Sequence, residues 1–194
     1  MTSLLQLSLS RSVAANTMST YPLYKQCDPK WATQTMVHKT LCAVGCLLTS
    51  TAMALAKNTI RIQDATPDPA SLNRYLQRNH GYVNHTDDLD ENAVAAIDPR
   101  RIHWNDNASM HRTNDLSWAQ VTARLDAGNV TIANVMHGRH FVLVVGYDPA
   151  TDDKLYVNDP GFDRASYSFS SDVVGWRLYD MAPLESPRVH GRPS

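Results

Sequence analysis

A cysteine follows a glycine at the head of an apolar run, LCAVGCLLTSTAMALA, in residues 41–56. A thiol reacts as its thiolate, and the unpaired N–H groups and positive dipole end of a helix N-terminus stabilise that anion. Gly45 lets the chain turn closely into the helix that we expect from Cys46 to about Lys57. A free cysteine is also among the most commonly buried residue types. The local sequence alone leaves Cys46 equally open to a catalytic role and a core role.

A thiolate nucleophile needs a base, and the base needs a group that orients it. His140 opens the strand-like run HFVLVVGY, where a strand would fix its backbone while the ring faces a cleft. His137 competes with it, but lies in the predicted turn HGR, where it would be held less rigidly. The other six histidines occur in polar, loop-like or terminal contexts, which favour the surface. His140 is therefore the preferred base, with a structural role as the alternative.

Asp159 ends the next strand-like run, in YVNDPG. If the runs 140–147 and 155–158 form a hairpin, the start of the first lies beside the end of the second. That geometry would bring the Asp159 carboxylate to the second ring nitrogen of His140, as in a catalytic triad. Asn158 is an alternative partner, but adjacent strand residues face opposite ways, so only one of the two can serve. Asp-Pro-Gly is also ordinary turn chemistry.

An oxyanion donor and the cysteine count complete the candidate chemistry. Gln26, in YKQCDPKW, is a polar amide just before a predicted turn, and alone it carries no functional information. The three cysteines lack the C-x-x-C pairs of structural zinc, so neither a metal nor a cofactor is expected. If Cys27 and Cys42 were bridged, the free thiol would be Cys46, whereas in a reducing compartment all three would stay thiols.

The elements that must position these residues change in character at Gly128. Before it, apolar periodicity with capping residues and stop signals predicts helices at about 46–57, 69–81, 90–97 and 116–127. After it, short β-rich runs separated by turn residues predict strands at about 130–136, 140–147, 155–158 and 174–180. Helices first and an antiparallel sheet last indicate an α+β fold.

Length and charge narrow the class of protein. A chain of 194 residues is expected to form one compact domain, here 21–182, between a flexible N-terminal segment 1–20 and a flexible C-terminal tail 183–194. The net charge of −1 argues against a nucleic-acid-binding face or a polybasic membrane patch. No apolar run approaches the ~20 residues that span a bilayer. We expect a soluble protein, cytoplasmic or exported, with its oligomeric state open.

Five ordered blocks, KQCDPKWA, AVGCLLTSTAMALA, TPDPASLNRYLQRNHGY, GRHFVLVVGYD and VNDPG, resemble the stand-alone, bacteriocin-leader-peptidase-like cysteine peptidases, family thirty-nine of the peptidase numbering. The similarity covers roughly residues 21–162. It implies a papain-like fold in which a central Cys-bearing helix packs on a C-terminal antiparallel sheet. It also implies Cys46 as the nucleophile, His140 as the general base, Asp159 as the residue that orients the histidine, and Gln26 as the oxyanion-hole glutamine.

The resemblance predicts a cysteine peptidase that acts on a peptide or protein substrate. Members that process bacteriocin leaders are usually fused to a membrane exporter with an ATPase, and this sequence has neither a P-loop pattern nor a membrane span. Cleavage after a double-glycine leader is therefore not carried over. Two alternatives stay open: an amidase, deamidase or acyl transferase with the same acyl-enzyme, and a non-catalytic peptide-binding module, because fold does not fix function.

Overall fold

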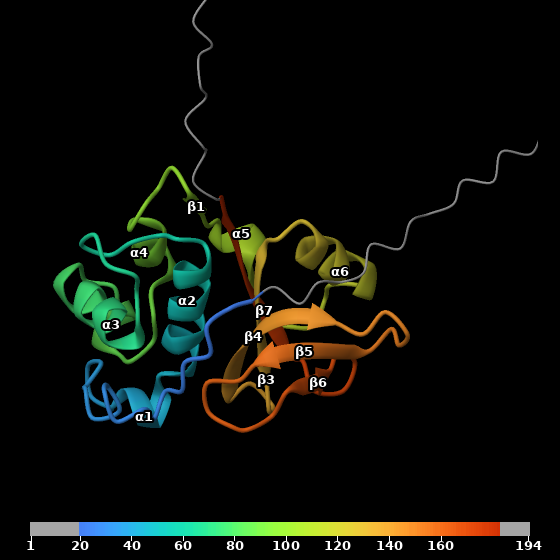
Figure 1. The fold of residues 1–194 in the computed structure, drawn as a ribbon, viewed down its shortest axis with the longest axis horizontal. Coiled ribbons are helices and arrows are strands. Elements are labelled where there is room, and N and C mark those ends of the chain that lie inside the picture. The colour runs from blue at the N-terminus through green and yellow to red at the C-terminus, as the bar shows by residue number, and fades with distance from the viewer. Residues whose placement is uncertain (1–19, 183–194) are drawn as a thin grey trace, which may run out of the picture.

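The computed structural model describes residues 20–182, so the expected terminal segments, apart from Thr20, lie outside the described residues. The helices all come before the longer strands of the sheet along the chain, as the sequence predicts (Figure 1). The helices are α1 (Leu41–Val44), α2 (Cys46–Lys57), α3 (Pro69–Arg78), the 3₁₀-helix η1 (Val83–His85), α4 (Glu91–Ala95), α5 (Asp106–Ser109) and α6 (Trp118–Asp126).

Seven strands within these residues form one sheet, and every pair in it is antiparallel. The order across the sheet is β1-β7-β3-β4-β5-β6, with β2 also paired to β7. The strands are β1 (Ile102–His103), β2 (Met110–His111), β3 (Val130–Val135), β4 (His140–Tyr147), β5 (Lys154–Asn158), β6 (Ser166–Ser168) and β7 (Gly175–Met181).

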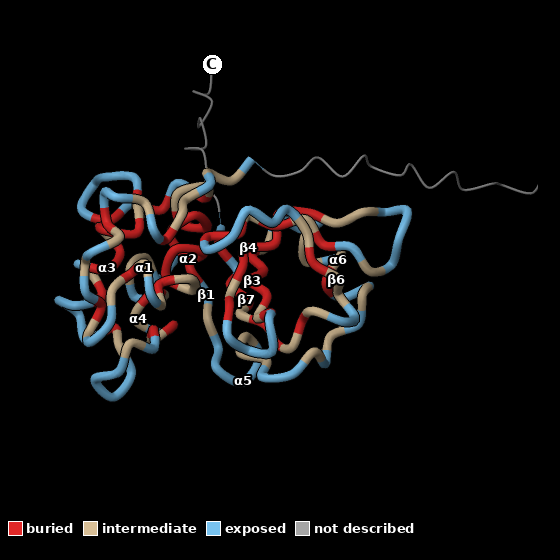
Figure 2. The backbone as a smooth tube through the Cα atoms, turned by 90° about the horizontal axis from the view of Figure 1, so that it is seen from below, coloured by how far each residue is buried: buried red, intermediate tan, exposed pale blue. Residues whose placement is uncertain are grey.

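Helices cover both faces of the central strands. α2 packs between α3 and one face of the sheet, and α6 packs against the other face (Figure 1). Ile132 and Leu143 accordingly belong to the core cluster around α2, while Ala133 and Val142 belong to the cluster around α6. Because both faces are covered, successive residues of β3 and β4 are mostly buried, and Figure 2 shows these strands and α2 buried among exposed loops.

Local chemistry explains where α3 begins and ends. α3 begins with a capping box, in which Asp68 accepts from the Ser71 N–H and Ser71 accepts from the Asp68 N–H. It ends at Arg78 rather than at the predicted Gly81. Gly81 still closes the helix end, because its N–H donates to the Leu76 carbonyl at 2.8 Å, and a Cβ there would stand 2.4 Å from a Leu76 side-chain carbon.

The short elements were not predicted. β1, β2 and β6 have two or three residues each, too few for a period of two to show in a sequence. The same holds for α5, a single turn. No helix among residues 20–182 is long and apolar enough to cross a membrane.

Candidate active site

Cys46 is the first residue of α2 and is partly exposed. The chain reaches it through α1 and the glycine between the two helices, whose N–H donates to the Leu41 carbonyl at 2.8 Å. A Cβ on Gly45 would lie 2.5 Å from that carbonyl oxygen, so only glycine permits the close turn. The thiol is thereby held at the N-terminal end of a buried, twelve-residue helix, where the helix dipole favours negative charge.

His140 and Asp159 meet because β4 and β5 are antiparallel neighbours, as the predicted hairpin requires. The distance from His140 Nε2 to Asp159 Oδ1 is 2.7 Å, and both side chains are buried. Asp159 Oδ1 also accepts from the N–H groups of Gly161 (2.8 Å) and Phe162 (2.9 Å), while Oδ2 accepts from the Tyr167 hydroxyl at 2.7 Å. The carboxylate is thus fixed by four donors.

The charges of this pair follow from its surroundings. Burial opposes ionisation of Asp159, but its hydrogen bonds from His140, Phe162, Tyr167 and Gly161 outweigh that effect and lower its pKa. Burial likewise opposes protonation of His140. The hydrogen bonds with Asp159 and Cys46, and the negative charges of both groups, outweigh it and raise the pKa of His140 to about 9. At neutral pH the ring of His140 is therefore positively charged, between Asp159 and Cys46.

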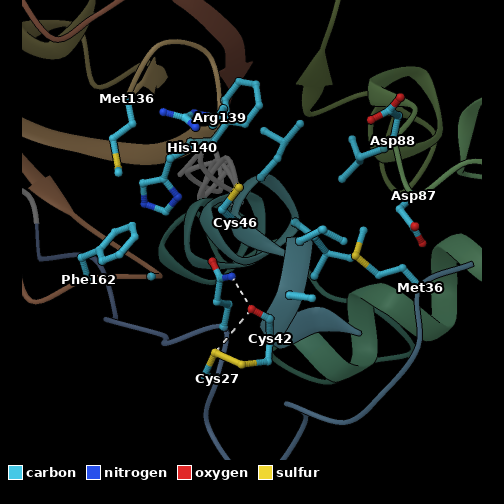
Figure 3. Close-up of a pocket in the computed structure, with 18 of the residues that line it drawn as sticks. Cys27, Met36, Cys42, Cys46, Asp87, Asp88, Met136, Arg139, His140 and Phe162 are labelled. Atoms are coloured by element: carbon cyan, nitrogen blue, oxygen red, sulfur yellow. Dashed lines mark hydrogen bonds between the residues drawn. A yellow bond between two sulfur atoms is a disulfide. The ribbon is translucent and has the colours of Figure 1, made fainter. Parts of the chain in front are cut away.

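The ring of His140 faces the thiol of Cys46 (Figure 3). Because Nε2 is used by Asp159, Nδ1 is the nitrogen left for the thiol. The four predicted residues are brought together at one cavity, which Cys46, His140 and Gln26 line and behind which Asp159 lies.

Gln26 is buried and held at both its backbone and its side chain. Its backbone N–H donates to the Pro160 carbonyl at 2.9 Å, and its Nε2 donates to the Cys42 carbonyl at 2.7 Å. A primary amide has two N–H bonds, so this hydrogen bond uses one of its two donors. Its Oε1 is buried and has no partner among the described residues.

The neighbours of Gln26 tie it to both halves of the molecule. Cys27 and Cys42 form a disulfide, which links this segment to the residues just before α2 and leaves Cys46 as the free cysteine (Figure 3). On the other side, Lys25 Nζ donates to the carbonyls of Asp159 (3.0 Å) and Phe162 (2.6 Å). Residues 25–27, which we call the 25–27 segment, thus join the α2 side of the cavity to the loop after β5.

The cavity has a volume of about 700 Å³, and different residue types line its two sides. Met36, Asp87 and Asp88 lie on one side of Cys46, and Met136, Phe162 and His140 lie on the other (Figure 3). Among residues 20–182, no three or more His, Cys, Asp or Glu side chains gather so that they could hold a metal ion.

The competing candidates lie elsewhere. His137 is exposed in the turn between β3 and β4, three residues from His140. Asn158 faces away from His140, and its side chain donates to the carbonyls of Tyr21 (3.3 Å) and Pro22 (3.1 Å). Adjacent residues at the end of β5 therefore point opposite ways, as expected.

Sequence reasoning missed two contributors to the site. Tyr167, which donates to Asp159, lies in the unpredicted strand β6. Lys25 adjoins Gln26 in the sequence, but its contacts are more than 130 residues away along the chain, and no local signal indicates them.

A buried helix that begins with a thiol, packed on an antiparallel sheet that carries a histidine–carboxylate pair, defines an α+β protein of the papain-like type. The model of the Peptidase_C39 like family matches residues 18–176, which is most of the chain, and the protein belongs to this family. The match confirms the resemblance and the fold class inferred from the sequence, and it indicates a function of the cysteine-peptidase type. Comparison with curated proteins and with solved structures gave no significant match.

Proposed function

We propose that this protein is a cysteine peptidase that hydrolyses peptide bonds through Cys46, His140 and Asp159, with Gln26 in the oxyanion hole. One observation carries the proposal: His140 binds Asp159 through one ring nitrogen and interacts with the Cys46 thiol, at the wall of a single cavity. Nucleophile, base and orienting group are the three parts that this chemistry needs.

The reaction begins from a Cys46 thiolate beside a protonated His140. The thiolate attacks the carbonyl carbon of the scissile bond, and the carbonyl oxygen becomes an oxyanion. The free amide N–H of Gln26 and the backbone N–H of Cys46 stabilise that oxyanion. His140 then donates its proton to the leaving amine, and the acyl group stays on sulfur as a thioester.

The second half releases the acyl group. His140, now neutral, takes a proton from water, and the hydroxide attacks the thioester carbonyl. The tetrahedral intermediate collapses, the carboxylic acid leaves, and the thiolate–imidazolium pair is restored. Asp159 acts through His140: it fixes the ring so that Nδ1 meets the thiol, and it stabilises the positive charge. This scheme requires neither a metal nor a cofactor.

Labelling of the thiol tests the proposal. Cys27 and Cys42 are oxidised in the disulfide, so a chloroacetamide or epoxide probe on unreduced protein reports Cys46 by mass spectrometry. We expect His140→Ala to slow labelling by about 10²–10⁴, the usual contribution of a positioned base. His137→Ala is the matched control, because this histidine is exposed in the neighbouring turn, and it should leave the rate unchanged.

Digestion of a peptide mixture tests the reaction itself. Cleavage by the wild-type protein, absent in Cys46→Ala, would support the peptidase. Conjugates or deamidated peptides without cleavage would replace it with the transferase or amidase alternative. Labelling that does not depend on His140, together with no chemistry on peptides, would leave a binding module and refute the catalytic reading.

A further inference from the structure

Large apolar side chains are exposed around the His140 side of the cavity. The part of the chain that the structure describes exposes four of them, and three lie here: Leu23 (56% exposed), Met136 (39%) and Phe162 (50%). Met136 and Phe162 line the cavity of Cys46, and Phe162 and Leu23 line the neighbouring one. The fourth, Val83, lies in η1 and lines neither. Exposed apolar groups that gather in this way mark a binding surface.

The neighbouring cavity, of about 360 Å³, shares Phe162 with the active-site cavity. Val145, Tyr156, Val157 and Ala165 contribute apolar surface to it. Phe162 borders both cavities, and a peptide bound on this side of Cys46 could contact both through this residue.

The charged groups at the edge of this second cavity already have partners. Lys25 pairs with Asp163 at 3.0 Å and donates to two backbone carbonyls, and Arg164 pairs with Asp172 at 2.8 Å. A charged ligand would have to compete with these pairs, whereas an apolar side chain gains the exposed surface without breaking them.

Phe162 is held in place before any ligand binds. Its N–H donates to Asp159 Oδ1, and its carbonyl accepts from Lys25 Nζ, so both of its backbone groups are fixed. Its ring stands edge-on to the ring of His140, with 5.1 Å between centroids. The next residue back, Gly161, allows this approach, because a Cβ there would be 2.9 Å from His140 Cε1. The surface is therefore preformed and needs little reorganisation to bind.

The proposed reaction indicates which part of the substrate contacts this surface. In the proposed reaction His140 gives its proton to the leaving amine, so the part of the substrate C-terminal to the scissile bond lies on the His140 side of Cys46. We propose that Met136, Phe162 and the cavity beyond them form the leaving-group subsite, which selects a bulky apolar side chain among the first residues after the scissile bond. This inference rests on the proposed function and names its substrate class.

Capture of the acyl-enzyme by amines measures this subsite directly. An activated ester acylates Cys46, and an added amino-acid amide then competes with water: its amine attacks the thioester, an amide bond forms, and the Cys46 thiol is released. Leucine and phenylalanine amides should be captured about tenfold better than glycine amide, the low end of what an apolar pocket discriminates. Glycyl-leucine amide against glycyl-glycine amide tests the second cavity in the same way.

Variants localise the effect. Phe162→Ala should reduce the leucine-to-glycine capture ratio to about threefold or less, since most of the apolar contact is lost. Leu23→Ser, which is exposed and borders only the second cavity, should reduce the ratio for the dipeptide amides alone. Val83→Ala is the matched control and should change neither ratio.

Separate results overturn this inference and the function beneath it. An acyl-enzyme that forms on Cys46 but captures all amines alike, or prefers aspartyl or lysyl amides, would refute the apolar subsite and leave the peptidase standing. A capture ratio that Phe162→Ala leaves intact would do the same. Failure of any ester to acylate Cys46 would refute the proposed function, and this inference with it.

Discussion

The Cys27–Cys42 disulfide provides a direct test of how the proposed oxyanion donor is held. Gln26 precedes Cys27, and its side chain donates to the carbonyl of Cys42, so the disulfide closes a small ring around that hydrogen bond. Replacing both cysteines with serine removes the covalent link and leaves no additional thiol. The hydrogen bonds of Gln26 to Pro160 and Cys42 remain available, but nothing covalent then holds their geometry.

The expected magnitudes differ for stability and for rate. The bridged cysteines are 15 residues apart, and closing a loop of that size contributes about 3 kcal/mol to the free energy of unfolding. That corresponds to a fall in Tm of about 6–12 °C for a domain of this size. Complete loss of one oxyanion donor lowers kcat by about 10²–10³-fold, and this is the largest effect that removing the disulfide could have through Gln26. The variant keeps the two hydrogen bonds that hold Gln26 and loses only the disulfide, so its kcat should be about tenfold lower than that of the wild type.

The assay is a double-mutant cycle on kcat, measured well below the Tm of every variant. It compares the wild type, Cys27→Ser/Cys42→Ser, Gln26→Ala and the triple variant. If the disulfide acts through Gln26, its removal lowers kcat about tenfold in the wild-type background and less than about twofold in the Gln26→Ala background, because coupled residues are not additive. KM should change little, since the oxyanion forms only in the transition state.

Two results would refute this reasoning. One is an equal loss of kcat in both backgrounds, which would show that the disulfide does not act through Gln26. The other is an unchanged kcat with a lowered Tm, which would make the link purely structural. Val121→Ala controls for general destabilisation: this residue is buried in the core around α6, on the other side of the sheet, and should lower Tm while leaving kcat unchanged.

Two further predictions concern His140. The value of kcat/KM should fall as pH rises through about 9, because His140 then loses the proton that pairs with the thiolate and is donated to the leaving amine. Asp159→Asn removes the main group that raises the pKa of His140, so it should move this alkaline limb of the pH–rate profile to lower pH. An alkaline limb that does not move would contradict the assignment. Gly161→Ala should lower kcat by tenfold or more with little change in Tm, because its Cβ would meet His140 Cε1 at 2.9 Å; a wild-type rate would show that the loop moves freely.

The sequence predicted those parts of the site that depend on short-range pattern. Short β-rich runs separated by turn residues predicted the hairpin, and the hairpin alone brings Asp159 to His140. A glycine before an apolar run predicted that α2 begins at Cys46. In both cases the residues that matter are adjacent to an element boundary, and boundaries with clear capping or turn chemistry can be read from local sequence.

The features that the sequence could not predict are contacts between residues that only the folded structure brings together. Whether Cys27 and Cys42 are bridged depends on the distance between their Cα atoms in the fold, about which a spacing of 15 residues says nothing. Lys25 reaches carbonyls on a loop that only the folded sheet brings near it. Tyr167 lies in a strand of three residues whose existence depends on pairing with β5.

The proposed catalytic groups come from two sides of the cavity, and two different kinds of contact hold them. Packing of α2 on β4 sets the distance between the backbones of Cys46 and His140, and this packing is core, so changing it costs stability. The 25–27 segment acts at the cavity itself, where its tethers reach a loop and a helix start rather than the core. The proposed catalytic groups can therefore lose their alignment while the core stays packed. Hence stability and rate should separate in this protein, with Val121→Ala affecting the first and Gly161→Ala the second.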